Sequence, residues 1–426
     1  MSEGHERCVG CDYLLWLGLT GRPILATLLI FLLAACSALP TPVVLDQDSF
    51  DGMSALVDNS PPARPLHILM VHGIGTTTPD QFESFIAALA NRLRLVQILP
   101  PSSERRSPGC RAAAASSKIV RLDPTLINIR GVPPEAQAQL YNYTFASTAD
   151  DSCNPTPVLN ISFLLWAPLT GDIKLAALEE NGAPSTQEFA YLAKDVFIDH
   201  YLADVVLYGG TYRDKVMRPS IQAALCYVTD GKPSEDGKTC RPLGNYNDPT
   251  IIVTHSLGGY MLMDAVDDEL FREHCATNTP ANKILRNTKF IYMMANQLAL
   301  LDLSTLQGYP RRLGGSRPDD NLAHRFAECW EIAKPSAEEQ VVAFSDPNDI
   351  LTWLVQRNNL KLPRPDWGSA QLTNVYLSND EFSIPFLFSE PSTAHNGYLD
   401  NPTVMEMLVC GMKNGAIKAC LPNGIP

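Results

Sequence analysis

A short apolar run, Ile251 to Val253, leads directly into the segment 254–259, THSLGG, and a helical pattern of apolar residues then continues to Phe271. β-branched residues before the serine are typical of a buried strand. The paired glycines permit a close turn into a helix. The sequence therefore predicts a strand, Ser256 and a helix in direct succession, with the Ser256 hydroxyl at the carboxyl end of a core strand.

Strand and helix patterns alternate along most of the chain. Such alternation is typical of a mostly parallel sheet covered by helices on both faces. We therefore expect an α/β fold with a doubly wound sheet. Strands are predicted at 66–71, 158–166, 250–254, 289–294, 340–345 and 374–377, and helices at 79–93, 257–271 and 402–410.

Two regions are less regular. Residues 99–156 carry clusters of Pro and Ser, and their one convincing β pattern lies at 119–129. We expect this region to be an insertion with its own small sheet. Residues 189–228 have helical spacing with a break at Gly209-Gly210, and we expect them to contribute to a helical cap.

Composition and charge narrow the class of protein. The 426 residues are 45% hydrophobic, which suffices for a substantial core. The net charge of -13 is spread along the chain, so the surface should repel nucleic acid. The chain has no H-E-x-x-H motif, phosphate-cradling loop or dinucleotide fingerprint, so we expect neither a metal nor a cofactor.

The N-terminus carries an export pattern. Arg22 precedes an apolar run of 12 residues, 24–35, which is short for a transmembrane helix and suits a signal peptide. The segment 33–36, LAAC, resembles the bacterial lipobox. That resemblance implies removal of residues 1–35, lipid attachment at Cys36 and a place in the cell envelope. In a cell with two membranes, Ser37 at the next position implies the outer membrane.

Residues 36–63 are rich in Pro, Ser and Asp and show no sustained periodicity. We expect them to be a flexible tether between the lipid and one folded domain at 64–426. Export to an oxidising compartment favours disulfides among the eight cysteines after Cys36. We expect pairs between neighbours in sequence, Cys110–Cys153, Cys226–Cys240, Cys275–Cys329 and Cys410–Cys420.

The segment around Ser256 resembles the G-x-S-x-G nucleophile elbow of α/β hydrolases, with Thr254 in place of the first glycine. The resemblance implies that Ser256 is the nucleophile. The segment 72–75, HGIG, follows a predicted strand upstream of the elbow, where this superfamily has its oxyanion loop. The expected oxyanion donors are the N–H groups of Leu257 and Ile74, with Gly73 as the alternative to Ile74.

His395 follows the last predicted strand and precedes the last predicted helix, the place of the base in α/β hydrolases. Two carboxylates, Asp346 and Asp349, follow the strand at 340–345. Asp349 matches the superfamily pattern better, since an apolar pair follows it; Asp346 precedes a proline and suits a turn. Asp302 is a further alternative. The order Ser256, Asp349, His395 is that of α/β hydrolases.

These residues predict a serine hydrolase that cleaves carboxylic esters through an acyl-enzyme, esterase-like or lipase-like and tethered to a membrane by lipid. The same triad also serves acyltransferases and thioesterases, so these activities stay open. From another class, a non-catalytic surface lipoprotein that keeps the hydrolase fold is the remaining alternative.

Overall fold

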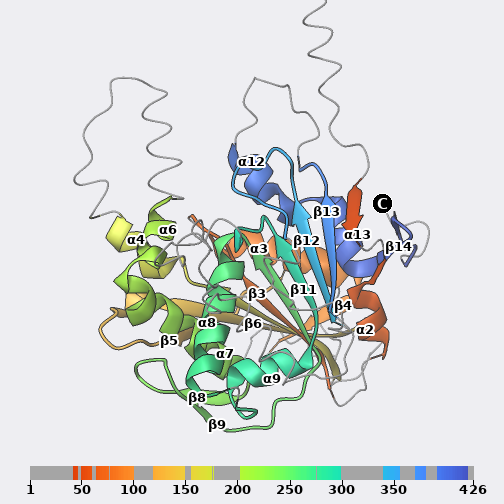
Figure 1. Ribbon diagram of the computed structural model, residues 1–426. Coiled ribbons are helices and arrows are strands. Elements are labelled where there is room, and N and C mark those ends of the chain that lie inside the picture. Colours follow the sequence, from red (N-terminus) through yellow and green to blue (C-terminus); the bar gives the residue numbers. More distant parts are fainter. Residues whose placement is uncertain are drawn as a thin grey trace, which may run out of the picture.

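A computed structural model describes most of the chain (Figure 1). The described residues are 42–46, 49–59, 64–75, 77–99, 119–148, 155–174, 176, 202–274, 276–298, 339–355, 370–379 and 391–420.

The centre of the molecule is a ten-stranded mixed sheet. Its order is β1 (Val43–Asp46), β13 (Ala370–Tyr376), β12 (Glu339–Ser345), β11 (Thr288–Met294), β10 (Thr250–His255), β3 (Leu66–Val71), β7 (Pro157–Leu165), β6 (Ala138–Ser147) and β4 (Leu95–Ile98), with β5 (Thr125–Ile127) paired to β6. The strands from β13 to β7 are all parallel, and antiparallel strands close both edges. The prediction of an α/β protein with a mostly parallel sheet is confirmed at this level.

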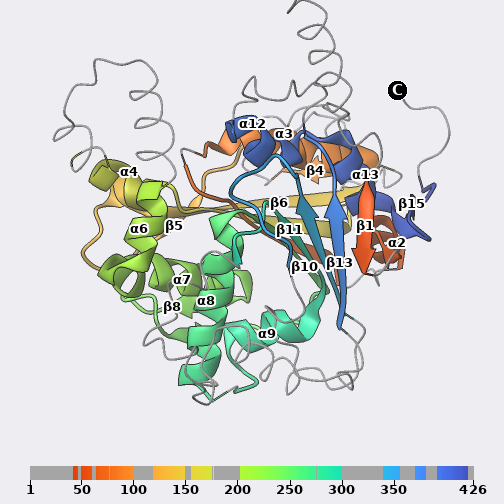
Figure 2. The same cartoon turned by 45° about the horizontal axis from the view of Figure 1, so that its top comes forward.

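Two apolar clusters lie on the two faces of the sheet, because successive side chains of a strand point to opposite faces. In β3, Leu69 and Val71 belong to one cluster, and Ile68 and Met70 to the other. The first cluster is covered by α7 (Arg218–Val228), α8 (Leu257–Arg272) and α9 (Pro280–Asn287), the second by α2 (Met53–Asn59), α3 (Pro79–Arg92) and α13 (Pro402–Cys410) (Figure 2).

Smaller elements complete the described fold. They are α4 (Pro168–Lys174), α6 (Ala203–Gly209), α12 (Pro391–Asn396), the 3₁₀ turns Pro134–Ala136 and Gly397–Leu399, the π-helical turn Arg213–Met217, and the short strands β2 (Phe50–Asp51), β8 (Gly231–Pro233), β9 (Cys240–Pro242), β14 (Gly411–Lys413) and β15 (Ala416–Ile417).

Within the residues that the structure describes, 99, 119–148 and 155–156, the expected insertion at 99–156 forms no sheet of its own. β6 pairs with β7 along most of its length, and β4 pairs with β6, so both extend the main sheet. The reason lies in β6 itself, whose Leu140 joins one apolar cluster while Tyr143 and Phe145 join the other. A strand with apolar residues on both sides needs cover on both faces, which the main sheet and its helices provide.

The expected cap at 189–228 is only partly described. α6 ends at Gly209, at the predicted break. α7 is buried along nearly its whole length and contacts α8 and α9, so it belongs to the helical layer and not to a cap. Residues 189–201 lie outside the described part of the chain.

The expected tether at 36–63 is wrong for the part that the structure describes. Val43–Asp46 pairs antiparallel with β13, and β2 pairs with β14. Phe50 and Met53 are buried in the core, so these residues are part of the fold. Residues 1–35 and Cys36 lie outside the described residues. Within the described part of the chain, no helix is long and apolar enough to cross a membrane.

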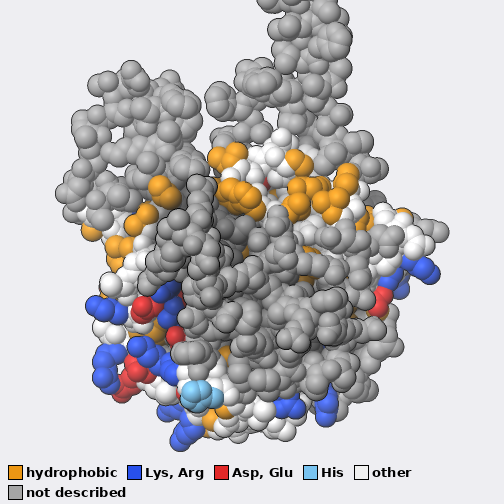
Figure 3. All heavy atoms as spheres, in the orientation of Figure 1, with side chains coloured by type: hydrophobic (Ala, Val, Ile, Leu, Met, Phe, Trp, Pro, Cys, Tyr) orange, Lys and Arg blue, Asp and Glu red, His pale blue; other side chains and the backbone are white. Residues whose placement is uncertain are grey.

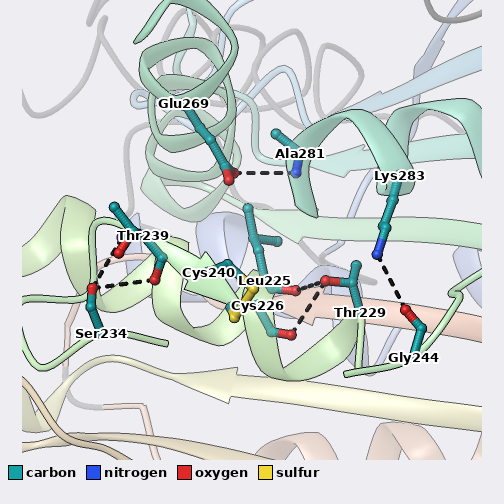
Figure 4. The surroundings of a disulfide bond; sticks show 10 residues. All are labelled: Leu225, Cys226, Thr229, Ser234, Thr239, Cys240, Gly244, Glu269, Ala281 and Lys283. Carbon is teal, nitrogen blue, oxygen red and sulfur yellow. Dashed lines mark hydrogen bonds between the residues drawn. A yellow bond between two sulfur atoms is a disulfide. The ribbon is translucent and has the colours of Figure 1, made fainter. Parts of the chain in front are cut away.

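Two of the expected disulfides are confirmed, Cys226–Cys240 and Cys410–Cys420. The first joins α7 to β9, a strand of the β8–β9 hairpin (Figure 4). Gly231 packs against this bridge, since a Cβ there would lie 2.4 Å from the Cys240 sulfur. The pairs Cys110–Cys153 and Cys275–Cys329 fall outside the described residues.

Candidate active site

Ser256 occupies a sharp turn between β10 and α8. Its φ of 52° is in the left-handed region, which non-glycine residues seldom adopt. The Ser256 N–H donates to the Met294 carbonyl of the neighbouring strand β11 at 2.8 Å, which fixes the turn to the sheet. The sequence prediction of strand, serine and helix is confirmed, and the side chain lies at the carboxyl end of β10.

The glycines after Ser256 explain how Thr254 fits where the elbow pattern has glycine. A Cβ at Gly259 would lie 3.0 Å from the Thr254 hydroxyl, so the glycine leaves room for that side chain. A Cβ at Gly258 would lie 2.1 Å from the His72 carbonyl oxygen. Gly258 therefore lets the start of α8 pack against the loop after β3.

His395 joins Ser256 and Asp349 in one hydrogen-bonded chain. The Ser256 hydroxyl donates to His395 Nε2 at 2.8 Å, and His395 Nδ1–H donates to the two Asp349 oxygens at 2.9 and 3.0 Å. All three side chains are buried. These contacts join residues 139 and 46 positions apart in the chain, in the order nucleophile, acid, base expected from the sequence.

Asp349 is held by its own loop as well as by His395. It accepts hydrogen bonds from the Leu351 N–H at 2.9 Å and from the Thr352 hydroxyl. Burial alone would raise the pKa of Asp349, but the hydrogen bonds from His395, Thr352 and Leu351 lower it below the usual value. The carboxylate therefore stays charged and holds the Nδ1–H tautomer of His395.

The carboxylate of Asp346, the alternative acid, accepts hydrogen bonds from backbone N–H groups. Its two carboxylate oxygens accept the N–H groups of Asn348 at 2.8 Å and Asn379 at 2.6 Å. Its own N–H donates to the Tyr398 hydroxyl at 2.6 Å. The carboxylate hydrogen-bonded to His395 is that of Asp349. Asp302, the other alternative, lies outside the described residues.

The loop after β3 lies against Ser256. A Cβ at Gly73 would be 2.5 Å from the Ser256 Cβ, so only glycine allows this approach. The Gly73 carbonyl accepts a hydrogen bond from His72 Nδ1 at 2.7 Å. Because the C=O and N–H of a trans peptide point in opposite directions, the Ile74 N–H points away from His72.

Several backbone donors near Ser256 have no acceptor within the described residues, among them the N–H groups of Gly73, Ile74 and Leu257. Leu257 begins α8, where the first N–H groups have no intrahelical partner. The Gly75 N–H, in contrast, donates to Asp204 at 2.9 Å. Leu257 and Ile74, with Gly73 as the alternative to Ile74, are the donors expected from the sequence.

His72 is buried and held on both sides of its ring. Its Nε2 accepts the N–H groups of Trp166 at 2.9 Å and Ala167 at 3.2 Å. The Trp166 indole stacks on the imidazole and donates to the His72 carbonyl at 2.9 Å. Burial lowers the pKa of His72 to about 3, so the ring stays neutral and keeps its Nδ1–H on the Gly73 carbonyl.

Sequence reasoning missed several residues that support the site, namely Lys174, Asp204, His255, Thr352 and Tyr398. The positions of His255, next to Ser256, and Tyr398, three residues after His395, were available signals. Asp204 had none, because it is 129 residues from its partner Gly75.

No group of His, Cys, Asp or Glu in the described part of the chain is arranged to hold a metal ion. No protein-family model matches the sequence, and no curated protein matches it either.

Proposed function

We propose that this protein is a serine hydrolase of the α/β-hydrolase type that cleaves carboxylic esters through an acyl-enzyme. The observation that carries the proposal is the hydrogen-bonded chain from Ser256 through His395 to Asp349, beside the Ile74 and Leu257 N–H groups, which have no acceptor in the described part of the chain. A nucleophile, an oriented base and a pair of oxyanion donors are the groups that acyl transfer requires.

Each group has a defined part in the reaction. Ser256 Oγ attacks the ester carbonyl carbon while its proton passes to His395 Nε2. The N–H groups of Ile74 and Leu257 stabilise the negative charge on the carbonyl oxygen. His395 then gives the proton to the leaving alcohol, and the acyl group stays on Ser256. Water, deprotonated by His395, attacks the acyl-enzyme, and the acid departs as Ser256 recovers its proton.

The position of the site in the sheet supports the assignment to α/β hydrolases. The oxyanion loop, the serine and the acid follow β3, β10 and β12, at the carboxyl ends of parallel strands. The next parallel strand along the chain, β7, lies on one side of β3, and the one after it, β10, lies on the other. Ligands of open α/β sheets bind at such a reversal of strand order.

The surface around the site favours an apolar acyl group. Leu202 and Val206, at α6, and Ile350 and Trp353, after β12, have exposed side chains. On the face drawn in Figure 3, the described hydrophobic side chains gather toward the end that carries α12 and α6, and most of the described charged side chains lie away from that end. A lipid on Cys36 would hold this site near membrane esters or imported acyl compounds.

The test is turnover of p-nitrophenyl esters of increasing acyl length by the purified protein and by Ser256→Ala. We expect ester cleavage by the wild type and a loss of about 10⁶-fold in kcat in the variant. Product analysis with added alcohol or amine separates hydrolysis from acyl transfer, and a thioester series tests the thioesterase alternative. Absence of Ser256-dependent turnover on all these substrates would leave the non-catalytic lipoprotein as the better account.

A further inference from the structure

A buried ion pair lies behind the oxyanion loop. Asp204, in α6, has no exposed surface, and its Oδ2 accepts the Gly75 N–H at 2.9 Å. Lys174, at the end of α4, places its Nζ 3.0 Å from Asp204 Oδ1, with only 11% of its side chain exposed. Buried carboxylates are rare without a partner, because removing the charge from water is costly.

The hydrogen bond to Asp204 complements the one made by His72. His72 Nδ1 holds the Gly73 carbonyl, which orients the peptide before Ile74. Asp204 holds the Gly75 N–H, which orients the peptide after Ile74. With both flanking peptides held, the direction of the Ile74 N–H is fixed before any substrate arrives.

We infer that Asp204 is a positioning residue that holds the oxyanion loop through the Gly75 N–H, and that Lys174 neutralises its charge. The inference rests on the proposed function. Without Lys174, a buried anion beside the loop would oppose the negative charge that develops on the substrate oxygen. The pair thus supplies an acceptor for Gly75 with little net charge.

The charge and the acceptor can be separated by substitution. The double variant Asp204→Asn with Lys174→Met, called Asn/Met, removes both charges and keeps an amide oxygen for the Gly75 N–H. The double variant Asp204→Leu with Lys174→Met, called Leu/Met, removes the charges and the acceptor at similar side-chain volume. Replacing a buried ion pair by apolar residues of similar volume is often neutral or stabilising, so the Leu/Met variant should still fold, and should melt below the Asn/Met variant because the Gly75 N–H loses its acceptor.

The kinetic difference between the two double variants is the test. On a p-nitrophenyl ester, we expect Asn/Met to keep kcat within about 3-fold of the wild type, and Leu/Met to lose about 10²-fold, as small misplacements in an active site do. KM should be the same in both, because the loop acts on the transition state. Asp204→Glu keeps the ion pair but displaces the acceptor, and should also lower kcat.

Equal kcat values for Leu/Met and Asn/Met would overturn the positioning role, as would unchanged kcat in Asp204→Glu if Leu/Met failed to fold. The wild type and Ser256→Ala are assayed alongside. Lack of Ser256-dependent turnover in the wild type would overturn the proposed function itself. Normal turnover with no difference between the variants would overturn only the role of Asp204.

Discussion

The Nε2–H of His255 donates a 2.8 Å hydrogen bond to the backbone carbonyl of His395. The residue before the proposed nucleophile is thereby tied to the main chain of the proposed base, and the ring centroids of the two histidines lie 5.2 Å apart. Burial lowers the pKa of His255 to about 4, so the ring is neutral and has one N–H, which this contact uses.

Without the hydrogen bond from His255, His395 should be held less firmly in place. We expect His255→Phe to lower kcat by about 10-fold or more through misplacement of His395. His255→Gln, whose amide nitrogen replaces Nε2, should retain most of the activity. The measurement is kcat on a p-nitrophenyl ester, with melting temperatures as control. Equal losses in the two variants would mean that the hydrogen bond has no part in positioning.

The two aspartates after β12 should differ sharply in kinetics. Asp349→Asn should lower kcat by about 10⁴-fold, because an amide can hold the wrong tautomer of His395. Asp346→Asn should change kcat little, and lower the free energy of unfolding by about 1 kcal/mol, since one of its two backbone hydrogen bonds is lost. Steady-state kinetics and chemical denaturation measure both, and the reverse ranking would identify Asp346 as the acid.

The fit between Thr254 and Gly259 predicts coupling between these positions. Gly259→Ala should destabilise the protein by about 1 kcal/mol, because the new Cβ meets the Thr254 hydroxyl. In a Thr254→Ala background the same change should be neutral or stabilising, since alanine favours a helix by about 1 kcal/mol over glycine. Chemical denaturation of the four proteins gives the coupling energy. Strictly additive effects would contradict the packing described above.

The buried carboxyl of Glu269 should make the free energy of unfolding depend on pH. Burial raises its pKa from 4.5 to about 7, and the carboxyl accepts the Ala281 N–H at 3.2 Å (Figure 4). A raised pKa means that the folded state binds the proton more tightly, so the stabilisation is full below pH 4.5 and is lost as the pH rises through 7.

The neutral variant Glu269→Gln should therefore be more stable than the wild type at pH 8, by about 1–3 kcal/mol. At pH 4 the two should be close. Glu273→Gln, at an exposed position in the next turn, should show no such dependence. The measurement is the free energy of unfolding of each protein at pH 4 and at pH 8. If Glu269→Gln and the wild type differed by the same amount at the two pH values, the assignment of the pH effect to Glu269 would be wrong.

Local pattern was enough to predict the core strands and the turn at Ser256. β-branched runs and paired glycines act over a few residues, and α13 begins and ends where the sequence predicts, Pro402–Cys410. Position along the chain singled out His395 once Ser256 was identified, but it left Asp346 and Asp349 both open, and the apolar pair after Asp349 favoured that residue.

Contacts between segments far apart in the sequence could not be predicted from local pattern. β1 pairs with a strand more than 300 residues later, and its four residues lie between Pro-rich and Asp-rich neighbours that favour a tether. The place of β6 in the sheet depends on its pairing with β7, and the contact between Asp204 and Gly75 depends on where α6 lies relative to the loop after β3. Such pairings are set by tertiary packing, which overrides local preference.

The central claim is that Ser256 is a nucleophile activated by His395. Its most direct test is reaction of the purified protein with a fluorophosphonate, followed by intact mass and peptide mapping. We predict one adduct per chain, on the peptide that contains Ser256, formed much more slowly in His395→Ala and absent in Ser256→Ala. Unchanged labelling in Ser256→Ala, or an unlabelled wild type that is fully folded, would contradict the claim.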